Sequence, residues 1–155
     1  MVKIFPAQTD KELEVVGRLL VEYVDSLGFD LVFQNFEAEL ANLPGEYAAP
    51  EGCVLLAKYQ DRPAGCVALR KLSNGICEVK RLYVRPQFRG LKIGRKLMEH
   101  IIAEARRIGY HAIQGDTVPS MQIAQALYAS LGFKEIEPYC RNPVEGAKFI
   151  ELKLV

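Results

Sequence analysis

Apolar residues recur along this chain at two different spacings, and the spacing distinguishes helices from strands. In residues 9–28 they return at every third or fourth position, which predicts an amphipathic helix. Thr9 or Asp10 can cap the start of this helix, and Gly28 can end it. The same spacing predicts further helices at residues 35–42, 93–108 and 120–132.

Short apolar runs and alternating segments predict the strands. Residues 53–60 and 65–72 flank the turn DRPAG and predict a hairpin, which leads into a third strand at 76–85. Strict alternation in that third strand predicts two faces, with Glu78, Lys80, Leu82 and Val84 on one, and Val79, Arg81 and Tyr83 on the other. Further strands are predicted at 111–117, 133–139 and 147–155. This order implies an α/β (α+β mixed) fold with a mixed sheet and helices on both faces.

Length and composition fit one soluble domain. The chain has 155 residues, half of them hydrophobic, and is expected to form a single domain over residues 1–155. No apolar run approaches the roughly 18 residues of a membrane span, and residues 1–16 lack the apolar region of a signal peptide. We therefore expect a cytoplasmic protein with no membrane partner.

The four cysteines do not indicate a metal site. They form no CxxC pair and no ligand-like cluster with His100 or His111. We interpret them as small buried hydrophobic residues, with a redox or zinc role as the alternative.

Charge is divided unevenly along the chain although the net charge is only +1. Residues 1–51 carry 10 acidic and 3 basic residues, whereas residues 52–155 carry 9 acidic and 17 basic residues. Seven of the 20 basic residues fall between Lys80 and Lys96, a segment without an acid. A block of one sign indicates a fixed anionic partner. Nucleic acid is not favoured, because no aromatic residues interleave the block in a recognised binding motif.

The densest part of this block, RPQFRGLKIGRKL at residues 85–97, has the composition of an anion site. It joins a predicted strand to a helix start, where N–H groups have no intrahelical acceptor. Gly90 lets the backbone approach a ligand closely, and Gly94 relieves crowding at the first turn. A solvated basic helix face would explain the composition, but not why cations gather at the positive end of the helix dipole. The glycine spacing fits neither a P-loop nor GxGxxG.

These residues resemble the GNAT superfamily of N-acetyltransferases. The family's signature Q/R-x-x-G-x-G/A follows a strand and opens a helix, as residues 89–94 do here, and LYASLGF at 127–133 resembles its second motif, LYxxxGF. The resemblance covers essentially the whole chain. It implies a GNAT-like mixed, mostly antiparallel central sheet with helices on both faces, and a cofactor cleft where the strands at 76–85 and 111–117 splay apart.

The resemblance also implies acetyl-CoA as co-substrate and no metal. The pyrophosphate is expected on the N–H groups from Arg89 to Arg95, with the pantetheine arm paired like an added strand against Leu82–Val84. Two positions depart from the family: Lys92 replaces the signature's middle glycine, and Met121 stands where an asparagine is frequent, so that Gln122 or water would take its place. The implied cofactor-binding residues are Leu82, Tyr83, Val84, Arg89, Gly90, Leu91, Lys92, Ile93, Gly94, Arg95, Gln122 and Tyr128.

Direct attack by an amine needs a base, an oxyanion donor and an acid, and the resemblance implies a candidate for each. Glu78 is the candidate base, directly or through water, with a structural salt-bridged glutamate as an equal alternative. The N–H of Val84 is the implied oxyanion donor. Tyr128 is the implied acid that protonates the CoA thiolate, with a packed core tyrosine as the alternative.

The acceptor is implied to be a primary amine, and we expect a small molecule. The acidic first third leads to the hypothesis that a cationic amine is attracted by Glu37, Glu39, Glu46 or Glu51, with a solvated acidic helix pair as the alternative. Three aromatic residues are expected either to pack in the core or to line the acceptor site: Phe29, Phe33 and Phe36. Asp116 is interpreted as a cap of the turn after its strand, with lining of the acceptor cleft as the alternative.

Two other functions remain open: a protein or peptide N-acetyltransferase, and a non-catalytic acyl-CoA-binding regulatory module. Family members often form dimers. The alternating segment KFIELKLV at residues 148–155 is a candidate for pairing between two copies in a homodimer, because a long edge strand needs cover.

Overall fold

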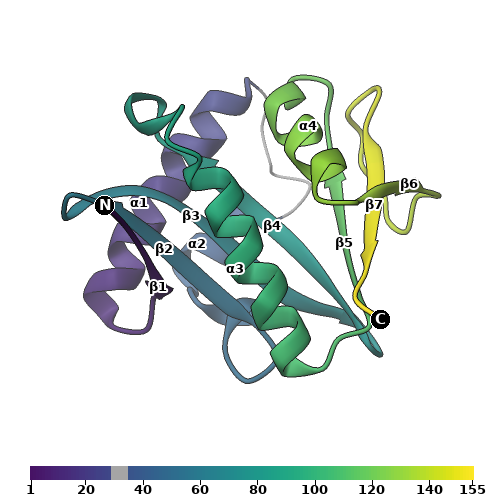
Figure 1. Cartoon of the computed structure of the whole chain (residues 1–155), viewed down its shortest axis with the longest axis horizontal. Coiled ribbons are helices and arrows are strands. Elements are labelled where there is room, and N and C mark those ends of the chain that lie inside the picture. Colours follow the sequence, from purple (N-terminus) through teal and green to yellow (C-terminus); the bar gives the residue numbers. More distant parts are fainter. Residues whose placement is uncertain (29–34) are drawn as a thin grey trace.

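The computed structural model describes residues 1–28 and 35–155. They form a seven-stranded sheet with the order β1-β2-β3-β4-β5-β7-β6 (Figure 1). Among the described strands, β4 and β5 form the one parallel pair, and the other neighbours are antiparallel. The strands are β1 (Val2–Pro6), β2 (Cys53–Tyr59), β3 (Arg62–Ser73), β4 (Ile76–Val84), β5 (Ala112–Thr117), β6 (Lys134–Ile136) and β7 (Lys148–Lys153).

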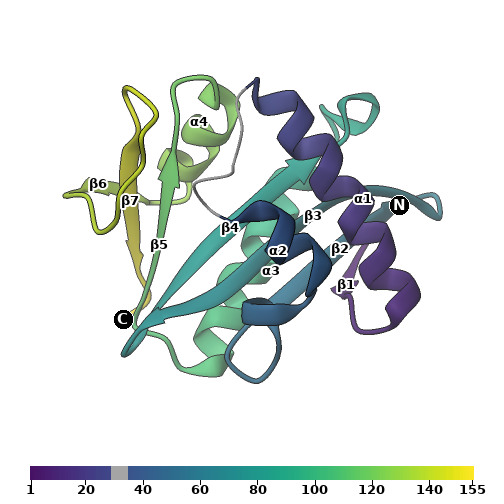
Figure 2. The same ribbon diagram turned by 180° about the vertical axis from the view of Figure 1, so that it is seen from behind.

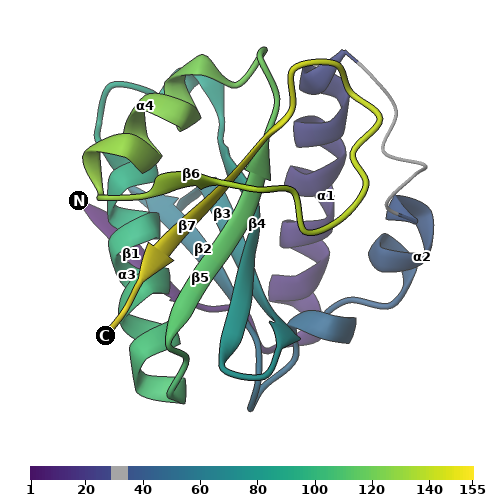
Figure 3. The same cartoon turned by 90° about the vertical axis from the view of Figure 1, so that its right-hand side faces the viewer.

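Helices cover both faces of the sheet, as the sequence predicted. Seen from behind, α1 (Asp10–Leu27) and α2 (Phe36–Ala41) lie on one face (Figure 2). The side view places α3 (Ile93–Ile108) and α4 (Gln122–Ser130) on the other face (Figure 3). Two short 3-10 helices, η2 (Gly45–Tyr47) and η3 (Pro86–Phe88), lie in connecting segments. None of the described helices is long and apolar enough to cross a membrane.

The helix ends follow the expected chemistry. Thr9 and Glu12 form a reciprocal capping box at the start of α1, and Gly28 ends the helix in a left-handed conformation. Inside α3, the side chains at helical spacing that pack on the sheet are Ile93, Leu97, Ile101 and Ala105. Burying each of the three larger ones stabilises the fold by about 1.5–3 kcal/mol.

The strands differ from the prediction in two places. First, β1 was not predicted, because it is short and depends on pairing with β2 along Val2–Pro6. Second, the sequence analysis offered the C-terminal strand for pairing between two copies. In the structure β7 is an inner strand, because β5 pairs along Lys148–Lys153 and β6 pairs with residues 149–151. The cysteine interpretation is confirmed for Cys53, Cys66 and Cys77, but Cys140 is exposed.

A β-bulge in β4 changes which residues face which side of the sheet. The register of β4 with β3 shifts around Arg81, whose φ of 64° is left-handed. Cys77 and Val79 precede the bulge, Leu82 and Val84 follow it, and all four pack in the core on the α3 face. Strict alternation predicted Leu82 and Val84 on the face opposite Val79. That prediction is wrong because the bulge inserts one extra residue and reverses the alternation.

Candidate active site

The parallel strands β4 and β5 separate after a short paired stretch. Ile76–Glu78 pairs with Ala112–Gln114, whereas β4 continues to Val84 and β5 to Thr117. Figure 1 shows the two strands diverging toward α4. Within the described chain, no strand pairs with the β5-facing edge of β4 beyond the paired stretch. We call this segment, residues 79–84, the open edge of β4, because its main-chain groups on the side away from β3 have no strand partner among the described residues, as an added strand requires.

The amide N–H of Val84 points toward this open edge. A Cβ built on Gly65 of β3 would lie 2.4 Å from the carbonyl oxygen of Tyr83, so that oxygen points at β3. Because the C=O and N–H of a trans peptide point in opposite directions, the N–H of Val84 points away from β3. The carbonyl oxygen of Val84 accepts a hydrogen bond from Arg89 Nε at 3.1 Å. The donor that the family resemblance implies therefore lies on the open edge.

The start of α3 presents backbone N–H groups that have no acceptor in the helix. The N–H of Lys96 donates to the carbonyl of Lys92 at 3.1 Å, so the N–H groups of residues 93–95 precede the first α-helical bond. Gly90 and Lys92 both have left-handed φ values, 89° and 62°, and turn the chain into the helix. Lys92 is the N-cap residue, and its side chain makes no capping hydrogen bond. This arrangement favours an anion.

The basic block divides into two groups with different partners. On β4 and just after it, Arg81 is bound by Glu39 and Arg85 by Glu22, each through two hydrogen bonds of 2.7–3.0 Å. At the helix start the pattern differs. No carboxylate of the described residues lies within ion-pair distance of Arg89, Lys92 or Lys96, and Arg95 donates to Ser130 Oγ at 3.0 Å. The cations at the start of α3 are thus largely left for an external anion.

Ion pairs between the two halves of the chain explain the uneven charge. Four pairs join residues of the acidic first third to basic residues of β3, β4 and the segment after β4: Glu22–Arg85, Glu39–Arg81, Glu46–Arg70 and Glu51–Lys71. Three of the four carboxylates in the hypothesis of an attracted cationic amine are therefore already engaged by the chain itself. The attraction of a cationic amine by this acidic group stays a prediction, and Glu37 is the one of the four residues that forms no ion pair with the described residues.

Tyr128 has a buried ring and an unengaged hydroxyl. The residue is 6% exposed, and its ring packs against Phe133 with centroids 5.5 Å apart. Its hydroxyl makes no hydrogen bond with any described residue. Burial raises the pKa of Tyr128 well above its ordinary value, and the nearby Tyr23 and Asp116 raise it further. The phenol is therefore protonated at neutral pH and able to donate.

Glu78 lies in a buried hydrogen-bonded network. The residue is 2% exposed. Its Oε1 accepts from Arg70 Nε at 2.8 Å, and its Oε2 accepts from the Tyr139 hydroxyl at 2.6 Å. The cross-strand ion pair that the alternative interpretation predicted is therefore present. The role of Glu78 as base stays a prediction.

Asp116 does not cap a helix, so that interpretation is wrong. The residue lies in β5, and its Oδ2 accepts a hydrogen bond from Asn142 Nδ2 at 3.0 Å. The N-cap of α4 is Met121, which makes no side-chain capping bond. Asp116 instead faces the segment between β6 and β7. Its charge affects the pKa of Tyr128 and Tyr139, which places it near the open end of the sheet.

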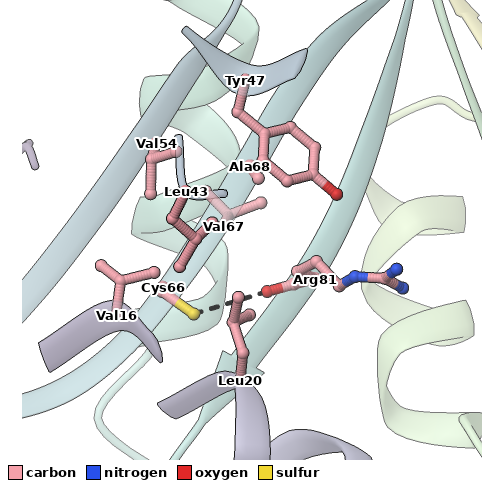
Figure 4. A pocket seen from close by; sticks show the side chains of 9 residues that line it. All are labelled: Val16, Leu20, Leu43, Tyr47, Val54, Cys66, Val67, Ala68 and Arg81. Carbon is pink, nitrogen blue, oxygen red and sulfur yellow. Dashed lines mark hydrogen bonds between the residues drawn. The ribbon is translucent and has the colours of Figure 1, made fainter. Parts of the chain in front are cut away.

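The bulge residue Arg81 is held from both sides. On the α1 side, Cys66 Sγ donates to its carbonyl oxygen at 3.6 Å, while the guanidinium points away from the apolar side chains around it (Figure 4). Those side chains enclose a small pocket that leaves no room for a water molecule, so it is not a ligand site. On the α2 side, the guanidinium lies 5.7 Å from the ring of Phe36.

Some predicted residues lie away from this centre, and others were missed. Gln122 is exposed at the first position of α4, and Phe29 and Phe33 lie outside the described residues. Sequence reasoning missed Tyr139 and Asn142 because their contacts to Glu78 and Asp116 span 61 and 26 residues. No group of three or more His, Cys, Asp or Glu within residues 1–28 and 35–155 is arranged to hold a metal.

Comparison with known proteins gives one family. The model described as Acetyltransferase (GNAT) family matches residues 17–133. An uncharacterized N-acetyltransferase from Schizosaccharomyces pombe is 39% identical over 155 residues, covering 99% of this chain and 95% of that protein.

Solved structures share the fold along the whole chain. An acetyltransferase of the GNAT family from Staphylococcus aureus has a TM-score of 0.83 at 22% identity, covering 100% of both chains. The PaiA N-acetyltransferase from Thermoplasma acidophilum, solved in complex with coenzyme A, has a TM-score of 0.75 at 15% identity, covering 99% of both chains. Identities at this level show a shared fold.

Proposed function

The chain belongs to the GNAT family of acetyltransferases and is an acyltransferase, and we propose that it transfers the acetyl group of acetyl-CoA to a primary amine of a small molecule by direct attack. One observation carries the proposal. The open edge of β4, with the Val84 N–H directed outward, is followed by a helix start whose first N–H groups have no acceptor in the helix. Among its cations, Arg89, Lys92 and Lys96 have no carboxylate partner in the described residues, whereas Arg95 lies 3.8 Å from Glu99. A ligand with a strand-like arm and a multiply charged phosphate end matches both features.

Residues 89–95 are proposed to hold the pyrophosphate. The backbone N–H groups after Arg89 supply the hydrogen bonds, because the N–H of Arg89 itself donates to the Pro86 carbonyl at 3.2 Å. Arg89, Lys92 and Lys96 supply charge that no described carboxylate neutralises. The arm would lie along Leu82–Val84. The coenzyme A bound to a protein of the same fold supports this assignment.

Three residues are proposed to take part in the acetyl transfer. The Val84 N–H is proposed to stabilise the negative charge that develops on the acetyl oxygen, and one such donor is worth about 3 kcal/mol. Tyr128 is proposed to donate its proton to the departing thiolate, because its hydroxyl is protonated and makes no hydrogen bond with the described residues. Glu78 is proposed to accept the amine proton, directly or through water.

A stability measurement tests the cofactor proposal. Acetyl-CoA at 100 times its Kd should stabilise the folded state by about 2.7 kcal/mol, which raises the Tm of a chain of this size by about 5–10 °C. NAD and ATP serve as controls for general phosphate binding. If millimolar acetyl-CoA left the Tm unchanged, the cofactor assignment would be wrong. A positive result leads to CoA-release assays with small amines and with peptide N-termini, which separate the two acceptor classes.

The role of Glu78 is tested by Glu78→Gln, which keeps the shape and removes the base. If Glu78 accepts the amine proton, kcat should fall by about 10²-fold or more and the acidic limb of the pH–rate profile should change. An ion pair with a purely structural role predicts a lower Tm with an unchanged pH profile. Arg70→Met, which breaks the same ion pair from the other side, is the matched control for lost stability.

A further inference from the structure

Two opposite charges face each other across the opening between β4 and β5. Glu78 and Gln114 form the last paired position of the two strands. Lys80 and Asp116 lie two residues further along each strand, so they project from the same face as that pair. The intervening Val79, and Ile113 on β5, pack in the α3-side core. Lys80 and Asp116 therefore face the α1 and α2 side, beyond the point where pairing ends.

The side chain of Lys80 is mostly buried, but its ammonium keeps some contact with solvent. Its side chain is 10% exposed, and its nearest carboxylate oxygen is Glu78 Oε1 at 4.0 Å. That oxygen already accepts from Arg70 at 2.8 Å. Lys80 makes no hydrogen bond with any described residue. Burial lowers the pKa of Lys80, and the neighbouring Arg81 lowers it further, so an added anion would be favourable here.

Asp116 supplies the opposite charge and is also incompletely engaged. Its Oδ2 accepts from Asn142, and it forms no ion pair with Lys80, with which it nevertheless interacts electrostatically. The other charged and titratable groups around the two residues are Glu78, Arg70, Arg81, Tyr139 and Cys140. Arg70 forms an ion pair with Glu46, and Arg81 forms one with Glu39 at 2.8 Å. Lys80, with its nearest carboxylate oxygen at 4.0 Å, therefore has the longest ion pair of the three cations.

We propose that the acceptor is an amino acid, whose carboxylate is bound by the Lys80 ammonium and whose amino group lies against Asp116. Lys80 and Asp116 form no ion pair with each other, and a zwitterion can bind both. Its carboxylate accepts hydrogen bonds from the Lys80 ammonium, and its amino group donates to the Asp116 carboxylate. The amino group then lies at the opening between β4 and β5, beside the open edge of β4. This inference rests on the proposed function and specifies its acceptor.

The test compares amino acids with their own carboxamides in a CoA-release assay with acetyl-CoA. The pairs are glycine, alanine, serine, aspartate and glutamate, each with its α-carboxamide. With the wild-type protein, at least one acid should exceed its amide tenfold or more in kcat/KM. Lys80→Met should abolish that preference by raising KM for the acid, while the amide changes less than twofold. Lys80→Arg should restore most of the preference. Asp116→Asn should slow acid and amide alike, because both carry the amine.

Controls separate this inference from the proposed function. Lys71→Met removes one positive charge from β3, at an exposed position, and should leave the acid preference unchanged. All variants should keep the Tm shift with acetyl-CoA. The inference would be overturned if acids and amides reacted with equal kcat/KM, or if Lys80→Met lowered kcat/KM equally for both. In either case a normal Tm shift with acetyl-CoA would still support the cofactor assignment. If acetyl-CoA gave no shift in the wild type, the proposed function would fail and the inference with it.

Discussion

Tyr128 combines a buried ring with a hydroxyl that no described residue satisfies. Among the described residues no fully buried polar side-chain atom lacks a partner, so this hydroxyl reaches solvent and is accessible to a ligand. The pKa of Tyr128 is raised chiefly by burial, which keeps the phenol protonated in the free protein. Core packing and proton donation are therefore compatible roles of one side chain, the ring serving the first and the hydroxyl the second.

Replacing Tyr128 by phenylalanine should separate these roles. Tyr128→Phe keeps the ring contact with Phe133 and loses no hydrogen bond within the described residues, so the Tm should stay within about 1 °C of the wild type. The turnover number should fall by about 10²-fold, with little change in KM for acetyl-CoA. Tyr59→Phe, on β2 against Phe88, is the matched control and should change neither. Full turnover in Tyr128→Phe would exclude the acid role.

Lys92 holds a conformation that suits glycine. Its φ is 62°, at the position where the family signature has its middle glycine. A left-handed conformation destabilises a non-glycine residue by about 1–2 kcal/mol. Glycine removes this strain, but it also makes the unfolded chain more flexible, which cancels part of the gain in stability. We therefore predict that Lys92→Gly stabilises the protein by about 0.5–1 kcal/mol in urea unfolding. Lys96→Gly, the same change inside α3, should destabilise it by about 1 kcal/mol. The prediction would be refuted if Lys92→Gly and Lys96→Gly lowered the free energy of unfolding by the same amount.

At the scale of the elements, local patterns were sufficient for most of the fold. The capping box of α1, the β2–β3 hairpin and the glycine-rich turn into α3 each depend on residues close in sequence. The bulge in β4 could not be predicted, because nothing in ICEVKRLYVR interrupts its alternation. It is fixed by long-range contacts of Arg81, which binds Glu39 across 42 residues. The contacts of Glu78 with Tyr139 and of Asp116 with Asn142 escaped prediction for the same reason.

The position of Gly65 fixes how closely β3 and the open edge of β4 approach. A Cβ there would lie 2.4 Å from the Tyr83 carbonyl oxygen and 3.3 Å from the Val84 Cα, so the two strands would have to move apart. We predict that Gly65→Ala destabilises the fold by about 1–3 kcal/mol and lowers kcat, because the Val84 N–H would shift.

Gly17→Ala is the matched control for this substitution. Its Cβ would meet Leu40 at 3.5 Å, an ordinary contact, within the helix α1. Helix propensity should make it stabilising by about 1 kcal/mol. The two changes of glycine to alanine should therefore have opposite signs in chemical unfolding. If Gly65→Ala changed neither the free energy of unfolding nor kcat, β4 would have to accommodate the added methyl group without a shift of the Val84 N–H.

At the scale of the whole molecule, charge is arranged between layers. The acidic helices and loops of the first third lie against basic residues of the sheet and of the segment after β4, and four ion pairs join the two parts. The sequence shows the segregation, but not that it is satisfied within the chain, since each pair links distant residues. Within the basic block from Lys80 to Lys96, this pairing leaves the cations at the start of α3 and the ammonium of Lys80, whose nearest carboxylate oxygen is 4.0 Å away. Those residual charges are the ones we assign to substrates.

The Glu22–Arg85 pair makes part of this arrangement measurable by pH. Hydrogen bonding to Arg85 lowers the pKa of Glu22 below its ordinary value of 4.5. A carboxyl with a lowered folded pKa stabilises the native state above its unfolded pKa and loses that contribution as pH falls through the folded pKa. Glu22→Gln should therefore lower the Tm at pH 7 by an amount equivalent to at most about 1 kcal/mol. The difference from the wild type should shrink steadily below about pH 4.5. Glu14→Gln, in an exposed pair of 3.9 Å with Arg18, should show no difference at either pH. A gap between Glu22→Gln and wild type that stayed constant down to pH 3 would mean that this pair contributes packing and not charge.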